Sequence, residues 1–100
     1  MQTHPKKLLV IIAEAALEKL LVKEARHLGA HGYTVAEVHG GGATGARDAD
    51  WEGNRSIRME VICDEAVAQS IAEHVLNSYC KNYSVSIFLA DVEVLRPGKF

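Results

Sequence analysis

The sequence has little net charge, few cysteines and no long apolar run, and each of these features excludes a class of protein. Its 100 residues carry a formal net charge of -2, which argues against a general affinity for nucleic acid or for anionic membranes. The two cysteines, Cys63 and Cys80, have no metal-ligand spacing between them. No apolar segment reaches the length of a membrane span, and the run at residues 8–12 is too short for a signal peptide. These features predict a protein of the reducing cytoplasm.

Motifs for catalysis are also missing. No pair of carboxylates has a spacing that enforces acid and base roles, and no serine or cysteine stands in a nucleophile motif. Gly40, Gly42 and Gly45 match the dinucleotide-binding fingerprint in spacing, but no helical periodicity follows them. The phosphate-binding P-loop fails as well, since Ala46 and Arg47 stand where Lys and Ser or Thr are required. We therefore expect a protein that is not an enzyme.

The histidines give little support to a metal site. His27 and His31 are four residues apart, but Gly29 lies between them and is expected to end the helix that a chelating pair would need. His39 could combine only with aspartates of the segment that follows it, without a supporting spacing. We expect neither a bound metal nor a cofactor.

The pattern of apolar residues predicts one domain, residues 1–100, with four strands and two helices. Gly29 and Gly32 are expected to end the first helix, and Asp64 to cap the second. The expected strands cover residues 7–13, 33–39, 56–63 and 84–95, and the expected helices cover residues 16–28 and 65–79. This order predicts an α+β, ferredoxin-like βαββαβ fold, in which an antiparallel four-stranded sheet carries both helices on one face.

The other face of such a sheet would be left without a covering layer. The last strand is apolar on both sides, through Val85, Ile87, Phe88, Leu89 and Ala90. An uncovered apolar sheet face is expected to pack on other subunits. The sequence therefore predicts a homo-oligomer.

The segment between the second and third expected strands is the best candidate for function. It contains about 15 residues, and a structureless loop of that length is uncommon in a compact domain unless it is functional. It opens with Gly40, Gly41 and Gly42, whose backbone N–H groups could converge on an anion, and Arg47 and Arg55 bracket the rest. The single tryptophan, Trp51, also lies here, which favours a partner or a ligand. The alternative is a solvated hairpin loop that binds nothing.

Four further cations outside this segment are candidate ligand contacts only when they are considered together. Taken singly, most such charges belong to a solvated surface. Together they lie on a strand, after the second helix and in the C-terminal segment, from where they could reach the glycine-rich loop of a neighbouring subunit. These residues are Arg58, Lys81, Arg96 and Lys99.

The chain resembles a known family, the PII-like signalling proteins. The resemblance is carried by Gly32-Tyr33-Thr34-Val35 running into Gly40-Gly41-Gly42, by Ile57-Arg58-Met59-Glu60-Val61 and by Val92-Glu93-Val94-Leu95. It is strongest to the branch associated with bicarbonate transporters and carboxysomes, and it covers nearly the whole chain.

The resemblance implies a homotrimer that binds adenine nucleotides in three clefts between subunits. The ligands implied are ADP and AMP, also cyclic AMP and bicarbonate, and the long loop at residues 40–55 would report occupancy to a membrane transporter or a carboxysome-related protein. The residues implied to bind nucleotide or anion, together with those derived above, are Gly40, Gly41, Gly42, Arg47, Arg55, Arg58, Lys81, Tyr83, Arg96 and Lys99.

The chain also departs from the standard PII pattern. The loop contains no tyrosine, so a loop tyrosine cannot be uridylylated here. The segment after the second helix lacks the glycine- and lysine-rich phosphate loop of PII proteins that sense ATP with 2-oxoglutarate, which favours ADP or AMP. Two alternatives stay open: a CutA-like metal-tolerance trimer, and a ferredoxin-like structural module that binds no nucleotide.

Overall fold

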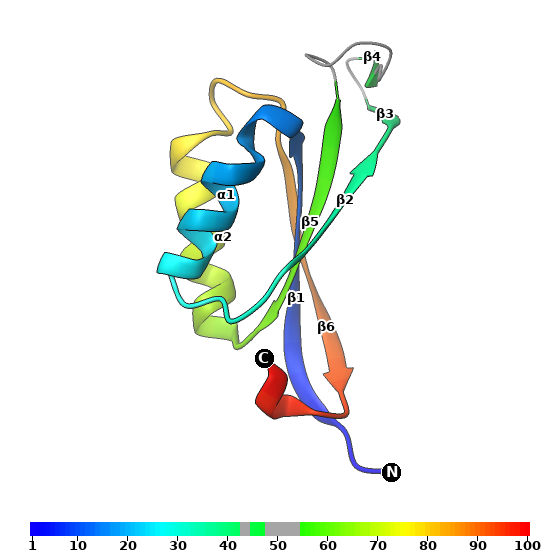
Figure 1. Cartoon of the computed structure of the whole chain (residues 1–100), viewed down its shortest axis with the longest axis vertical. Coiled ribbons are helices and arrows are strands. Elements are labelled where there is room, and N and C mark those ends of the chain that lie inside the picture. Colours follow the sequence, from blue (N-terminus) through cyan, green and yellow to red (C-terminus); the bar gives the residue numbers. More distant parts are fainter. Residues whose placement is uncertain (43–44, 48–54) are drawn as a thin grey trace.

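The structure, a computed structural model, describes residues 1–42, 45–47 and 55–100, with side chains for residues 1–40 and 55–100. Figure 1 shows an elongated molecule, with extents of 44, 27 and 22 Å. The elements in chain order are β1 (His4–Glu14), a 3₁₀ turn (Ala15–Leu17), α1 (Glu18–His27), β2 (Thr34–Val38), β3 (Gly40–Gly42), β4 (Gly45–Arg47), β5 (Ser56–Cys63), α2 (Glu65–Ser78), β6 (Ser86–Val94) and a second 3₁₀ turn (Pro97–Lys99).

The main sheet has the order β2-β5-β1-β6 with every neighbouring pair antiparallel. Both helices lie on one side of it (Figure 1). The ferredoxin-like fold predicted from the sequence is therefore confirmed, and β5 has the predicted bounds. None of the described helices is long and apolar enough to cross a lipid bilayer.

The core lies between the helices and one face of the sheet. Leu9, Ile11 and Met59 are at most 1% exposed and point toward the helices. Leu21 of α1 and Ile71 of α2 belong to the same buried cluster. Each such side chain contributes about 1.5–3 kcal/mol when it leaves water. The core also contains Cys63, and burial raises the pKa of its thiol.

The opposite face of the sheet, here called the open face, carries apolar side chains that no helix covers. Val10 lies there between Glu60 on β5 and Phe88 on β6. Phe88 is 45% exposed, and the Arg58 guanidinium lies 5.8 Å from its ring centroid. Arg58 also donates a hydrogen bond to Glu60 at 2.9 Å. Exposed apolar side chains gathered on one face of a sheet are typical of a surface that meets another protein.

The connection after α1 depends on one glycine. Gly29 has φ = +116°, the only positive φ among the described residues. A Cβ at this position would lie 3.2 Å from Cγ2 of Val67 on α2. The position therefore requires glycine for its backbone and for its packing.

We expect Gly29→Ala to destabilise the fold by about 1–2 kcal/mol, because alanine is strained in the left-handed backbone and crowds Val67. Urea unfolding would measure the change. Gly32→Ala is the matched control, since a Cβ there meets nothing within 4 Å, and its stability should match that of the parent or exceed it. Equal stability of the two variants would contradict this role for Gly29.

The predicted cap of α2 is confirmed in position but not in its hydrogen bond. Asp64 occupies the N-cap position of α2 but makes no side-chain capping bond. Its carboxylate instead accepts a hydrogen bond from Lys6 Nζ at 2.6 Å, and this pair lowers the pKa of Asp64.

The prediction of a structureless loop from residue 40 onward was wrong for the start of that segment, because β3 pairs with β4 in a two-stranded ribbon. Backbone pairing needs no side chains, so a run of glycines can still form it. Residues 43–44 and 48–54, with Asp48, Asp50 and Trp51, lie outside the described residues.

Candidate functional site

The end of the sheet from which the β3–β4 ribbon extends is here called the loop end, and the opposite end, with both chain termini, the terminal end (Figure 1). At the loop end, Ser56 pairs with Val38 on one side and with Glu14 on the other. The Ala15 N–H donates to the Arg55 carbonyl oxygen at 2.8 Å. This bond fixes the backbone of Arg55 beside the start of the first helical turn.

A pocket of about 300 Å³ lies at the loop end, where β2 ends and β5 begins. It is lined by Glu37, Val38, His39, Arg55 and Ser56. The Arg55 side chain is 47% exposed, and its Nη1 lies 3.5 Å from a Glu37 carboxylate oxygen. A surface pair at this separation is weak, so an incoming anion can compete for the guanidinium.

Of the residues that line this pocket, only Arg55 is predicted from the sequence as a ligand contact. Glu37 and Ser56 carried no signal, since a polar residue at a strand end is usually solvated. His39 was considered only as a metal ligand. Their position on two neighbouring strands becomes visible only with the register between β2 and β5.

The glycine run and Arg47 face each other across the β3–β4 ribbon, where Gly40 pairs with Arg47. In an antiparallel pair, the backbone groups of successive residues point alternately toward the partner strand and away from it. A Cβ at Gly40 would meet nothing within 4 Å, and its φ is not positive. No contact within the described part of the chain therefore requires glycine at position 40.

The remaining predicted site residues are spread over the molecule. Lys81 and Tyr83 are exposed in the connection between α2 and β6, which returns to the sheet at the loop end. The Tyr83 ring packs edge-on against Tyr79, with centroids 6.1 Å apart. Arg58 lies on the open face and is paired with Glu60.

Arg96 and Lys99 lie at the terminal end, after β6 (Figure 1). The eleven residues of β1 run between the two ends, a distance of about 35 Å at the usual rise per residue. One protomer therefore cannot bring these two cations to the glycine run. A single site that contains all the predicted residues needs a second copy of the chain.

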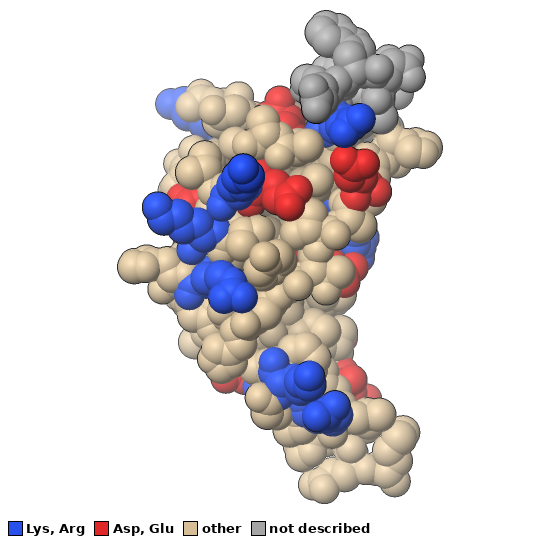
Figure 2. Space-filling model, in the orientation of Figure 1, with Lys and Arg blue, Asp and Glu red and all other residues tan. Residues whose placement is uncertain are grey.

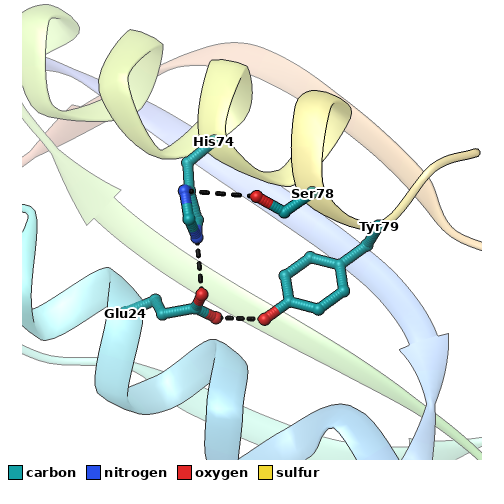
Figure 3. Close-up of polar contacts among 4 residues, drawn as sticks. All are labelled: Glu24, His74, Ser78 and Tyr79. Atoms are coloured by element: carbon teal, nitrogen blue, oxygen red, sulfur yellow. Dashed lines mark hydrogen bonds and ion pairs between the residues drawn. The ribbon is translucent and has the colours of Figure 1, made fainter.

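A polar network that sequence reasoning missed joins the two helices (Figure 3). One carboxylate oxygen of Glu24 lies 2.6 Å from Nε2 of His74, and the other accepts a hydrogen bond from the Tyr79 hydroxyl. Ser78 Oγ lies 3.5 Å from Nδ1 of the same imidazole. Desolvation first, and then the bond to Glu24, raise the pKa of Tyr79 to about 12. Glu24 is thereby fixed with both oxygens engaged.

The described residues contain no group of three or more histidine, cysteine, aspartate or glutamate side chains that could hold a metal ion. His27 and His31 are separated by the bend at Gly29.

Comparison with known proteins decides the family. The sequence model of the family described as nitrogen regulatory protein P-II matches residues 6–99. The chain belongs to the P-II family. This places it with the PII-like proteins that the sequence resembles, and not with the CutA-like alternative.

Solved structures of PII-like proteins share the fold of this P-II protein along its whole length. A PII-like signalling protein from Thermus thermophilus is 40% identical, with a TM-score of 0.86 over 100% of this chain and 99% of that one. The nitrogen regulatory PII-like protein CPII from Thiomonas intermedia, bound to ADP, AMP and bicarbonate, is 25% identical, with a TM-score of 0.87 over 99% and 96% of the two chains. CPII bound to ADP and bicarbonate is 25% identical, with a TM-score of 0.88 over 99% and 97%.

Proposed function

We propose that this P-II protein is a homotrimer that binds ADP or AMP in clefts between its subunits and signals through the segment at residues 40–55. One observation carries the proposal: the predicted nucleotide-binding residues lie at opposite ends of one protomer. They can meet only when the loop end of one copy approaches the terminal end of another. The open face provides apolar surface for that assembly.

In the proposed cleft, the two protomers contribute different parts. Gly40, Gly41, Gly42, Arg47 and Arg55 hold the phosphates from the loop end of one copy, with backbone donors and guanidinium groups. Lys81 and Tyr83 border the same end. Arg96 and Lys99 come from the terminal end of the neighbouring copy. Arg58 lies on the open face, so it would border a cleft only where the open faces of two copies pack together.

The small number of cations favours a ligand with few phosphates. CPII binds ADP, AMP and bicarbonate, which supports the same ligands here, with cyclic AMP as a further adenine nucleotide. We propose that bicarbonate binds together with nucleotide, and that the protein acts in the cytoplasm on a transporter or carboxysome-related partner in inorganic-carbon uptake. It senses its ligands and does not transform them.

Isothermal titration calorimetry with ADP, AMP, cyclic AMP and ATP, each with and without bicarbonate, tests the proposal. We expect ADP or AMP to bind with one site per protomer and more tightly than ATP, and bicarbonate to change the affinity. A ferredoxin-like structural module would give no heat with any nucleotide. That result would overturn the proposed function.

Gly40 gives a sharper test, because no described contact explains a glycine there. We expect Gly40→Ala to leave the melting temperature unchanged but to weaken ADP binding by about 1 kcal/mol, the loss of one backbone hydrogen bond to a closely approaching phosphate. Gly32→Ala is again the matched control and should bind ADP as the parent does. Unchanged ADP affinity of Gly40→Ala would remove Gly40 from the site.

A further inference from the structure

A second cavity lies in the helix layer, on the side of the molecule away from the open face. It has a volume of about 670 Å³ and is lined by Lys23, Glu24, Arg26, His27 and Leu28 of α1 and by His74 of α2. The volume is in the range of small-molecule sites, about 300–1,000 Å³. The lining residues of α1 belong to the half of that helix that runs toward the terminal end (Figure 1). The cavity is therefore separate from the pocket at Arg55.

The charges around this cavity are unbalanced. Glu24 is its one carboxylate, and both oxygens already have partners in His74 and Tyr79 (Figure 3). The side chains of Lys23 and His27 make no hydrogen bond or ion pair with any part of the chain that the structure describes. Figure 2 shows Lys and Arg side chains gathered over the helices. The two permanent cations of the lining, Lys23 and Arg26, therefore have no counterion among the described residues.

The cavity also has a fixed wall and an apolar lining. The bonds of Glu24 to His74 and Tyr79 join α1 to α2 and hold the imidazole in place. The Arg26 guanidinium is held over the Tyr33 ring, 5.4 Å from its centroid. Leu28 and the alkyl stems of the long cationic side chains supply apolar surface. Groups that are already ordered lose little entropy when a ligand binds.

We propose that this cavity binds a small organic anion, whose carboxylate or phosphate group meets Lys23 and Arg26 and whose apolar body lies against Leu28. An exposed lysine and a planar guanidinium bind such anions through charge-assisted hydrogen bonds. Glu24 makes its contacts with His74 and Tyr79 and forms no direct ion pair with either of these cations. The site does not depend on nucleotide binding or on the trimer.

Amide chemical-shift titrations of the full chain test the proposal with three probes of one shape. Benzoate and phenyl phosphate carry the two head groups, and benzamide is the neutral counterpart of benzoate. We expect saturable shifts at residues 23–28 and 73–79 with one or both anions and none with benzamide. The anion that saturates at the lower concentration identifies the head group.

Two matched variants locate the charge. Lys23→Gln should raise the dissociation constant of the better anion at least fivefold. Lys19→Gln removes the same charge one turn earlier, outside the cavity lining, and should bind as the parent does. The proposal is overturned if benzamide produces the same shifts as benzoate, if Lys23→Gln binds like the parent, or if the anions shift only Gly40–Gly42 and Arg55. The last pattern would assign them to the proposed nucleotide site instead.

Discussion

Phe88→Asp is expected to reduce the mass of the protein in solution to that of one chain. Phe88 is half-exposed on the open face, beside Val10 and beneath the Arg58 guanidinium. In the proposed trimer, each copy would lose the burial of one phenyl ring, about 1.5–3 kcal/mol, and would have to desolvate a carboxylate. Size-exclusion chromatography with light scattering measures the mass directly.

Leu76→Asp is the matched control for this experiment. Leu76 is 52% exposed on α2, in the layer on the other side of the sheet, so the same apolar-to-acidic change should leave the trimer intact. Circular dichroism should show a folded chain in both variants, because neither side chain belongs to the buried core. A trimeric Phe88→Asp would show that the open face is not the interface. A monomeric parent would overturn the trimer itself.

The fold was predictable because the spacing of apolar residues determines which segments form strands and helices and which of their faces are buried. In β5, residues 57, 59, 61 and 63 are buried, and this alternation predicts both the strand and the face that meets the helices. The stripes of α1 and α2 have the same origin. The β3–β4 ribbon had no such signal, because glycines have low strand propensity and no side chains whose pattern could reveal a face.

The candidate site was predictable as a set of residue types but not as an arrangement. Glycine and arginine in one segment indicate anion binding, and the sequence therefore led to Arg55 and Arg47. It could not show that the Arg58 guanidinium lies over the Phe88 ring on the open face, since the neighbours of Arg58 on other strands depend on register. Nor could it reveal the contact between Glu24 and His74, which lie 50 residues apart in the chain.

We expect Arg47→Ala to weaken ADP binding by about 1–3 kcal/mol, the range for losing a hydrogen bond to a charged group. Arg47 ends β4 directly opposite Gly40, so its backbone lies beside the backbone donors of the glycine run. Two parallel N–H groups of a guanidinium match a phosphate or a bicarbonate. Isothermal titration calorimetry with ADP would give a dissociation constant about 5- to 150-fold higher than that of the parent.

The size of the Arg47 effect should depend on the shape of the cation as well as on its charge. Compared with Arg47→Ala, Arg47→Lys is expected to recover only part of the affinity for ADP. An ammonium group is a point charge and cannot reproduce the two parallel N–H donors of a guanidinium. Arg26→Ala removes the same side chain from the helix layer and should leave ADP binding unchanged. If Arg47→Ala binds ADP, AMP and bicarbonate as the parent does, Arg47 does not hold the anion. Arg55, with its guanidinium already at the pocket of the loop end, and Arg96 would then be the next cations to replace.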